Sequence, residues 1–490
     1  MSGIVNLRTC GDKTISSLPV RRGWHAFVPS AYSRGHPIRP MSANPVSVDP
    51  PKQAKGLSSP WCFVFTLYFA AGMCGGGIIG NLTAVMYADM GYSNVFIGGV
   101  ALLSLPTSIR FLWSAYIDAI GSKRNLACFF IACLGLICLL LSLVIYIDFA
   151  FTWTTLILFG LLSFCFASLE ISADGYYIRA LSLRRQAEFV GIKAAAIRLG
   201  IIFVLVVLVR LAGELTDREW AANTAWGTVL LSAACIFFIL AAYNFRFLPQ
   251  AQDDHAVKNK GFALAAVVRD YLKMEKVWAV MLLILCYRWG QGLLFFMLVP
   301  FFMNSWEDGG MAMSTSEVAL LKTYTDMPWM IVGGIVGGMI IKRFGLRLVF
   351  IPMAFMMNLP NLLYVYVAFV QPEGMIQILG TQFYTKLFIV SCFESLGYGL
   401  GFAAFFFYIH AISTGRNKTS RLAISSGLMG LGFFVPGGIS GIIQSWLGFP
   451  GLFIVSTVVG MGAILLILLV PMPRIREEPK PAEPLADEKA

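Results

Sequence analysis

Long apolar runs alternate with short polar connectors along the chain from Trp61 to Pro471. Each run has about 20 residues or more, the length that an α-helix needs to cross about 30 Å of hydrocarbon at about 1.5 Å per residue. We therefore predict an all-α membrane protein. The pattern predicts twelve transmembrane helices, over residues 61–86, 94–117, 126–147, 153–179, 187–212, 223–245, 277–303, 316–342, 347–370, 376–412, 419–442 and 449–471.

Polar segments divide this pattern into two halves of six helices each. Within the long middle connector, residues 262–272 mix apolar and charged side chains, which is typical of an amphipathic helix on a membrane surface. The predicted organisation is a disordered basic tail, a first six-helix bundle, a cytoplasmic linker with this amphipathic helix, a second six-helix bundle and a second disordered tail, over residues 1–60, 61–245, 246–276, 277–471 and 472–490.

The first tail is basic and contains little that would pack into a core. Residues 1–48 include one acid, Asp12, against six lysines and arginines. We interpret the segment as a disordered cytoplasmic tail, or as the result of a start placed too early, with Met41 as the initiator. Since transit peptides are also rich in arginine and serine and poor in acids, an organelle-targeting segment is the alternative.

Composition excludes a soluble architecture. Hydrophobic residues make up 58% of the chain and charged residues only 13%, whereas a soluble domain carries about 25% charged residues. The net charge of +11 does not indicate nucleic-acid binding, because the basic residues lie in the connectors. The tails and the even-numbered connectors hold 29 of the 37 lysines and arginines, and the odd-numbered connectors hold only Arg218. This asymmetry predicts that both termini are cytoplasmic.

Cysteine and histidine give no sign of a metal centre or of catalysis. The ten cysteines form no Cys-x-x-Cys pair, and the four histidines are scattered. A membrane-embedded enzyme would more often show His, Cys or Asp constellations at metal-ligand spacing. We therefore favour a transporter over an enzyme or an assembly factor, and we expect no metal.

Charged side chains inside the predicted helices are the main candidates for function. Each costs about 2.5–3.5 kcal/mol at the bilayer centre on insertion scales, so it needs a partner or a wet cavity. The candidates are Arg110, Glu170, Asp174, Lys193, Arg198, Arg288, Lys322, Asp326, Lys386 and Glu394.

The spacing of the acids separates three cases. Glu170 and Asp174 are four residues apart and share a helix face, so they repel each other unless one is protonated or a cation lies between them. Lys322 and Asp326 have the same spacing with opposite charges, which fits a self-satisfied ion pair as well as a functional role. Glu394 stands alone in an apolar, glycine-rich helix, which favours a function.

Fixed cations occur in both halves together with these acids. Arg198 and Arg288 fit two roles, as buried partners of the acids or as ligands of an anionic substrate. Acids that exchange protons, combined with cations that hold an anion, favour a secondary transporter over a channel lined by one sign of charge. Glycines at spacings of three to four predict close helix packing in the first and eighth helices, at Gly72, Gly75, Gly76, Gly77 and Gly80 and at Gly333, Gly334, Gly337 and Gly338.

Two connectors carry a family resemblance. The connector after the second helix reads Asp118-Ala-Ile-Gly121-Ser-Lys123-Arg124, which resembles the Asp-x-x-Gly-x-Arg/Lys loop of the major facilitator superfamily. The segment after the eighth helix resembles its counterpart, with Lys342 at the acidic position. The resemblance implies two pseudo-symmetric six-helix bundles. It also implies a conformational latch at Asp118, Gly121, Lys123, Arg124, Gly338, Arg343, Gly345 and Arg347.

Within that superfamily, residues 60–470 resemble the AmpG-type muropeptide permeases and the related acetyl-coenzyme A transporters. The stretches that carry this resemblance include Arg110-Phe-Leu-Trp113, Glu170-Ile-Ser-Ala-Asp174-Gly-Tyr and Phe393-Glu394. The resemblance implies proton-driven symport of muropeptides across the bacterial inner membrane in peptidoglycan recycling, with the proton gradient as energy source and no cofactor. A carrier of another organic anion, such as an acyl-coenzyme A, is the alternative.

If the branch is correct, the buried charges divide into two groups. Substrate carboxylates would be held by Arg110, Arg198, Arg288 and Lys322, and Trp113 would stack on a sugar face, as would Tyr176, Trp289 and Tyr324. Proton coupling would rest on Glu170, Asp174, Asp326 and Glu394.

Overall fold

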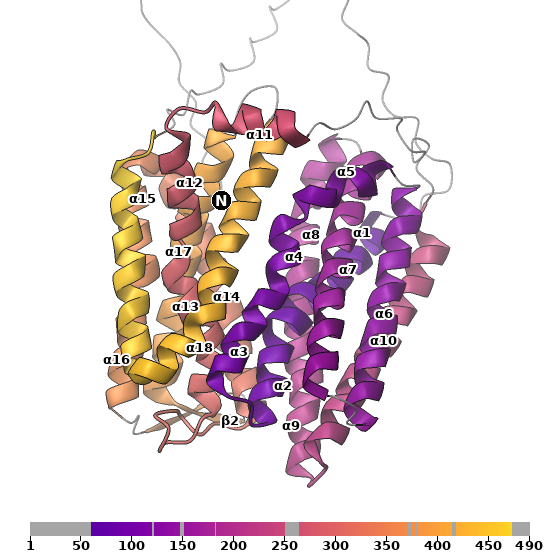
Figure 1. Ribbon diagram of the computed structural model, residues 1–490, viewed down its shortest axis with the longest axis vertical. Helices are drawn as coiled ribbons and strands as arrows, with labels where there is room; N and C mark the ends of the chain where they lie inside the picture. Colours follow the sequence, from indigo (N-terminus) through magenta and orange to yellow (C-terminus); the bar gives the residue numbers. More distant parts are fainter. Residues whose placement is uncertain are drawn as a thin grey trace, which may run out of the picture. The chain divides into compact units, whose positions relative to one another are not determined.

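The computed structural model describes residues 60–119, 122–147, 151–181, 183–249, 264–370, 374–378, 380–413 and 418–472 (Figure 1). The two predicted tails lie almost wholly outside these ranges, as does most of the linker before residue 264. Within them the chain is nearly all helical.

Six spans form the first half, and two of them contain π-helical segments. The first span is α1 (Pro60–Gly72), η1 (Met73–Leu82) and α2 (Thr83–Asp89), and the second is α3 (Asn94–Val100), η2 (Ala101–Ser104), α4 (Leu105–Ile109) and α5 (Phe111–Ala119). The remaining four are α6 (Lys123–Ile147), α7 (Phe151–Ala180), then α8 (Leu183–Phe203) with η3 (Val204–Val209) and α9 (Arg210–Asp217), and finally α10 (Ala222–Phe247).

The second half also has six spans, although its last two are joined. They are α12 (Val277–Cys286) with α13 (Trp289–Met303), α14 (Thr315–Phe344), α15 (Leu346–Asn358) with α16 (Asn361–Phe369), α17 (Thr385–Ile412), and the two parts of α18 (Lys418–Leu465) followed by η4 (Leu466–Leu468). In the described ranges, eleven helices are long and apolar enough to cross a membrane, and the longest has 48 residues. Gly448 has φ +68° inside it and divides it into two spans. The predicted twelve-helix fold is confirmed.

The predicted tenth helix, over residues 376–412, begins too early. Residues before Thr385 form an antiparallel hairpin of β1 (Met375–Ile378) and β2 (Thr381–Tyr384), with Ile378 opposite Thr381. Gly380 in the turn has φ +88°, a conformation that no helix contains and that glycine adopts at little cost. Phe383 packs into the core of the second half, so the apolar residues of this segment are buried as strands.

The linker helix α11 (Leu264–Leu272) and the hairpin lie at opposite ends of the second half (Figure 1). We call these the α11 end and the hairpin end. The α11 helix is tied to α18 by an ion pair of 3.0 Å between Asp270 and Arg421 and by a hydrogen bond of 3.0 Å between the hydroxyls of Tyr271 and Ser425. The predicted amphipathic segment is therefore a helix packed on the second half.

Close backbone approaches hold neighbouring spans together. A Cβ at Gly72 would meet the backbone of Ile197, and one at Gly200 would meet the backbone of Phe69 and Met73. In the second half, Gly333 and Gly399 bring α14 and α17 into direct backbone contact. The glycine prediction is wrong for Gly334 and Gly338, where a Cβ would meet nothing within 4 Å, and for Gly80, where it would meet only the Gly75 carbonyl of its own span.

The π-helical segment η1 is stabilised by two side chains at its C-terminal end. Asn81 donates from Nδ2 to the Gly76 carbonyl at 2.7 Å, and Thr83 donates from Oγ1 to the Ile78 carbonyl at 2.6 Å. π-Helical turns are rare and are frequent at functional sites. Here the segment presents its glycines and Asn81 to the cavity between the halves.

Candidate functional site

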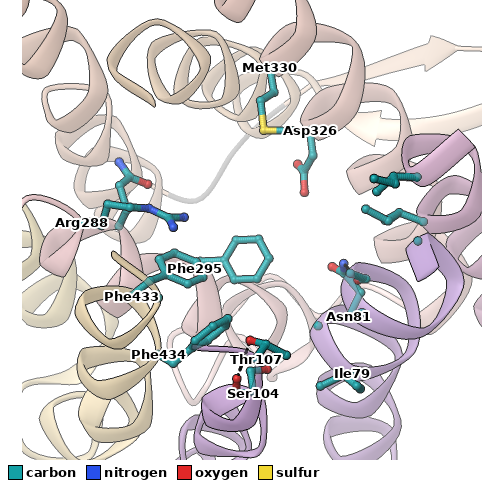
Figure 2. Close-up of a pocket in the computed structure, with 18 of the residues that line it drawn as sticks. Ile79, Asn81, Ser104, Thr107, Arg288, Phe295, Asp326, Met330, Phe433 and Phe434 are labelled. Atoms are coloured by element: carbon teal, nitrogen blue, oxygen red, sulfur yellow. Dashed lines mark hydrogen bonds between the residues drawn. The ribbon is translucent and has the colours of Figure 1, made fainter. Parts of the chain in front are cut away.

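A cavity of about 570 Å³ lies between the two halves. This volume is within the range of small-molecule sites. Six charged side chains line it, Arg110, Glu170 and Arg198 from the first half and Arg288, Asp326 and Glu394 from the second. Figure 2 shows Arg288 and Asp326 reaching into the open space, with Asn81 on the facing wall. The lining therefore carries three cations and three acids, drawn equally from both halves.

In the first half, Glu170 and Asp174 are each paired with a cation. Arg110, at the joint between α4 and α5, forms an ion pair with Glu170 on α7. Asp174 forms an ion pair of 2.6 Å with Lys193 on α8 and accepts a hydrogen bond of 2.7 Å from the Tyr68 hydroxyl. The repulsion expected between Glu170 and Asp174 is thus removed by two cations from different helices.

In the second half, Lys322 and Asp326 form an ion pair of 2.9 Å within α14. Lys322 is 1% exposed and lies 5.0 Å from the centre of the Phe295 ring. Asp326 lines the cavity, and Lys322 does not. The ion pair that the spacing predicts is confirmed, and the Asp326 carboxylate points toward the cavity (Figure 2).

Glu394 on α17 is 8% exposed and lines the same cavity. In the described ranges, no lysine or arginine lies within 4.0 Å of its carboxylate. Its hydrogen-bond partner is the Ser395 hydroxyl, which donates at 3.4 Å. A buried carboxylate without a cation is costly as an anion and is readily kept as the neutral acid. Glu394 is therefore the acid of the cavity best suited to take up and release a proton.

Two arginines line the cavity without an acidic partner among the residues that the structure describes. Arg288 is 8% exposed, its guanidinium lies 4.0 Å from the centre of the Phe433 ring, and its Nε has no hydrogen-bond acceptor. Arg198 donates from Nη1 to the Met327 sulfur at 3.7 Å. Since a sulfur and aromatic rings are weak substitutes for a carboxylate, both arginines retain the capacity to bind an anion. One comes from each half.

Comparisons with known proteins agree with this architecture. The sequence model of the Major Facilitator Superfamily matches residues 310–489. A bacterial homolog of the human lysosomal transporter Spinster, solved in an inward-facing and occupied conformation, superposes with a TM-score of 0.64 at 13% identity, covering 84% of this chain and 97% of that one. The chain has the major facilitator fold.

Two relatives in sequence carry AmpG-type names. The Rickettsia bellii protein that carries the name transporter AmpG 1 is 23% identical over 405 residues, covering 80% of this chain and 94% of that protein. The anhydromuropeptide permease of Escherichia coli is 23% identical over 311 residues, covering 63% of this chain and 58% of the permease. The chain thus resembles the AmpG-type proteins in sequence, as its motifs predicted, and the match spans most of the length of the Rickettsia protein.

The loop residues typical of the superfamily make local contacts in the first half. Lys123 is fully buried, donates to the Ile117 carbonyl at 2.7 Å and lays its aliphatic stem against Gly175. Arg124 donates to the Leu248 carbonyl at 2.7 Å and to the Phe245 carbonyl at 2.5 Å, so it caps the C-terminal end of α10. The Asp118 side chain and Gly121 lie outside the described residues.

The corresponding loop of the second half is a helix terminus with exposed charges. Gly345 ends α14 with φ +76°. Glycine adopts this conformation at little energetic cost, because it has no Cβ. Arg343 and Arg347 are exposed, and Gly338 faces open space. The latch role of these residues stays a prediction.

The aromatic residues predicted to stack on cargo do not line the cavity. Trp113 stacks on Phe164 at 4.8 Å between ring centres and donates to Ser168 at 3.2 Å, because α5 turns it toward α7. Tyr176, Trp289 and Tyr324 are also absent from the cavity lining. Two of the predicted charged residues, Asp174 and Lys322, lie outside the lining as well. Phenylalanines supply the aromatic wall instead, from Phe295, Phe433 and Phe434 (Figure 2). Phe296 lines the same cavity.

Of the polar lining residues that the sequence analysis did not identify, the sequence spacing points to two. Gln291 follows Arg288 by three residues, and Tyr398 follows Glu394 by four, so each shares a helix face with a charge that was identified. The Gln291 side chain donates to the Met357 carbonyl at 2.6 Å. The Tyr398 hydroxyl accepts from Arg288.

A carboxylate joins the two halves at the hairpin end. Asp89, at the end of α2, accepts a hydrogen bond of 2.8 Å from Trp226 of its own half and one of 2.6 Å from the Thr315 hydroxyl of the other half. Thr315 is the first residue of α14, so the negative charge also lies at the positive end of that helix dipole. Asn304 donates to Asn94 across the same boundary at 3.4 Å.

Proposed function

We propose that the chain is a proton-driven symporter that carries anionic sugar–peptide fragments of the cell wall into the cytoplasm by alternating access. The observation that carries the proposal is the cavity itself. It combines Arg198 and Arg288, which lack acidic partners in the described part of the chain, with Glu394, a buried acid that lacks a cation. The name of the Escherichia coli relative, an anhydromuropeptide permease, supplies the cargo class.

The two arginines suit a cargo with separated carboxylates. Arg198 belongs to α8 and Arg288 to the joint between α12 and α13, so an anion that contacts both would draw the halves together. Phe295 and Phe433 offer apolar faces beside Arg288, which suits the non-polar faces of sugar rings (Figure 2). The cargo would thus be an amphiphilic anion, not a free inorganic ion.

Glu394 would couple cargo movement to protons. When the cavity is open to the more acidic side, the carboxylate takes a proton and becomes neutral in its apolar site. When the cavity opens to the cytoplasm, it releases that proton. On the adjacent helix α14, Lys322 and Asp326 form an ion pair whose net charge is zero. Proton transfer at Glu394 would therefore change the net charge of the cavity wall that contacts the cargo.

The orientation in the membrane follows from the distribution of basic residues. We assign the α11 end to the cytoplasm and the protein to a bacterial inner membrane, with both termini inside, because lysine and arginine concentrate in the connectors at that end. The Asp89 contacts would then close the periplasmic side. They would have to break in each transport cycle.

Uptake into proteoliposomes tests the proposal. Labelled anhydromuropeptide is offered to liposomes with and without an inside-alkaline pH gradient, containing wild type or Arg288→Gln, with Tyr408→Phe as a variant outside the cavity. We expect gradient-driven accumulation by wild type and Tyr408→Phe and loss of affinity of about 30-fold or more in Arg288→Gln, since a charge-assisted hydrogen bond contributes about 1.5–3 kcal/mol. No uptake by folded wild type would remove the muropeptide assignment.

A further inference from the structure

Arg288 is held by neutral groups, and one of them is a hydroxyl. Its Nη2 donates to the Tyr398 hydroxyl at 2.5 Å, its guanidinium lies over Phe433 at 4.0 Å, and Phe402 lies at 5.3 Å. Among the described residues, none accepts a hydrogen bond from its Nε. The side chain is nearly fully buried, so the phenol oxygen replaces part of the hydration that this cation has lost.

Tyr398 occupies a position between the groups proposed to bind cargo and to couple it to protons. It lies on α17 one helical turn after Glu394, and both side chains line the cavity. The Tyr398 ring stacks on Phe402, with centres 5.7 Å apart and planes within 10°, so the hydroxyl is oriented by packing.

A phenol oxygen is a weaker acceptor for a guanidinium than a carboxylate, which binds arginine with two charge-assisted hydrogen bonds. Arg288 could offer a carboxylate two donors. One is the Nη2 that contacts Tyr398, and the other is the Nε, which has no acceptor among the described residues. A carboxylate that engaged both would satisfy the free donor and displace the phenol. A neutral cargo would have to give up the phenol contact without an equivalent replacement.

We propose that Tyr398 is a specificity-determining residue whose hydroxyl substitutes for a cargo carboxylate on Arg288 in the empty cavity and is displaced when an anionic cargo binds. This inference rests on the proposed role of Arg288 as the anion site. The phenol contact stabilises the empty state, so a cargo displaces the phenol only if it binds Arg288 more strongly than the phenol does. Carboxylates meet this condition and uncharged analogues do not. Its displacement would also change the contacts of α17 one turn from Glu394.

The variant Tyr398→Phe removes the hydroxyl and keeps the ring that stacks on Phe402. The matched control is Tyr408→Phe on the same helix, because the Tyr408 hydroxyl is buried without a hydrogen-bond partner and lies outside the cavity lining. Binding is measured by thermal-shift titration of the full chain in nanodiscs, after gel filtration shows that each variant is monodisperse. Three ligands are compared, namely anhydromuropeptide, its carboxyl-amidated form, and citrate as a carboxylate that does not depend on the assigned cargo.

We expect Tyr398→Phe to bind anhydromuropeptide and citrate about tenfold more tightly than Tyr408→Phe, because the empty state loses a hydrogen bond to a charged group. The amidated form leaves the phenol on Arg288 in place, so its affinity should differ less than threefold between the two variants. Equal affinities in the two variants, or weaker carboxylate binding by Tyr398→Phe, would overturn the proposal, the latter because it would make Tyr398 a direct ligand of the cargo.

Arg288→Gln separates this inference from the proposed function. If citrate shows the expected order and anhydromuropeptide binds no variant, the cargo assignment fails and the role of Tyr398 stands. If Arg288→Gln binds both carboxylates as tightly as wild type, the anion site is elsewhere and both proposals are wrong. If Arg288→Gln loses binding while Tyr398→Phe matches Tyr408→Phe, only the role of Tyr398 is wrong.

Discussion

The two halves place a glutamate at the same point of their helix order and surround it differently. Glu170 lies on the fourth span of the first half and Glu394 on the fourth span of the second. Each half also has a cation on its second span, Arg110 or Lys322. In the first half the cation pairs with the glutamate, whereas in the second half it pairs with Asp326 on its own helix. Glu394 is left with a serine hydroxyl.

Because of this difference, Glu170 is held as an anion, whereas Glu394 can change its protonation state. An ion pair between two spans fixes both charges, since protonating Glu170 would leave Arg110 without a partner. Glu394 carries no such penalty, because no cation depends on it in the described ranges. The second and fourth spans also meet differently, through side chains in the first half and through the backbones at Gly333 and Gly399 in the second.

The largest effect should come from exchanging the two glutamates for glutamines. Glu394→Gln should abolish accumulation driven by a pH gradient while cargo counterflow at equal pH continues, because the neutral amide mimics the protonated acid permanently. Glu170→Gln should retain gradient dependence. Labelled-cargo uptake and counterflow in proteoliposomes distinguish the two modes. If Glu170→Gln loses the gradient response and Glu394→Gln keeps it, the roles of the halves are reversed.

The ion pair of the first half should contribute mainly to stability. Glu170→Gln leaves Arg110 unpaired and should cost about 1–3 kcal/mol, less than for a fully buried pair because both side chains are about a third exposed. The double variant Arg110→Gln/Glu170→Gln should recover part of that loss. Thermal unfolding in detergent measures both. A double variant less stable than either single variant would indicate that the residues do not depend on each other.

The backbone contact of the second half can be tested with neighbouring glycines. Gly333→Ala would place a methyl group against the backbone of Leu396 and Gly399, and overpacking of this kind costs about 1–3 kcal/mol. Gly334→Ala is the matched control, since nothing lies within 4 Å of its Cβ position. Only Gly333→Ala should lower the unfolding temperature. Equal stability of the two variants would mean that α14 and α17 are not in direct contact there.

The smallest effect concerns the contact that joins the halves at the hairpin end. Asp89→Asn removes the negative charge at the start of α14 and weakens the bond to Thr315, which should cost about 1 kcal/mol and shift the conformational equilibrium about fivefold toward separation of the hairpin ends. Spin labels at Trp220→Cys and Met375→Cys, in a variant without native cysteines, report the distance between those ends. An unchanged distance distribution would exclude Asp89 from the closure.

Sequence reasoning succeeded where the relevant contact is local. The spans follow from apolar length, and the pair of Lys322 and Asp326 follows from a spacing of four on one helix. The pair of Arg110 and Glu170 did not follow, because it depends on which spans adjoin in three dimensions. The hairpin was missed because a short apolar strand and the start of an apolar helix have the same composition.

The aromatic wall of the cavity illustrates the same limit. The chain has 39 phenylalanines, and nothing in the sequence sets Phe295 and Phe433 apart from those that face lipid. Tyr398 and Gln291 were within reach, because each shares a helix face with a charge already identified. A search of helical neighbours around every buried charge would have found both.

The most direct test of the central claim is whether cargo brings protons with it through Glu394. Proteoliposomes loaded with a pH-sensitive dye are held without a gradient, and anhydromuropeptide is added outside to wild type and to Glu394→Gln. We predict acidification of the lumen by wild type and none by Glu394→Gln, although labelled cargo still equilibrates across the membrane in the variant. Acidification by Glu394→Gln at the wild-type rate would show that Glu394 does not couple cargo to protons.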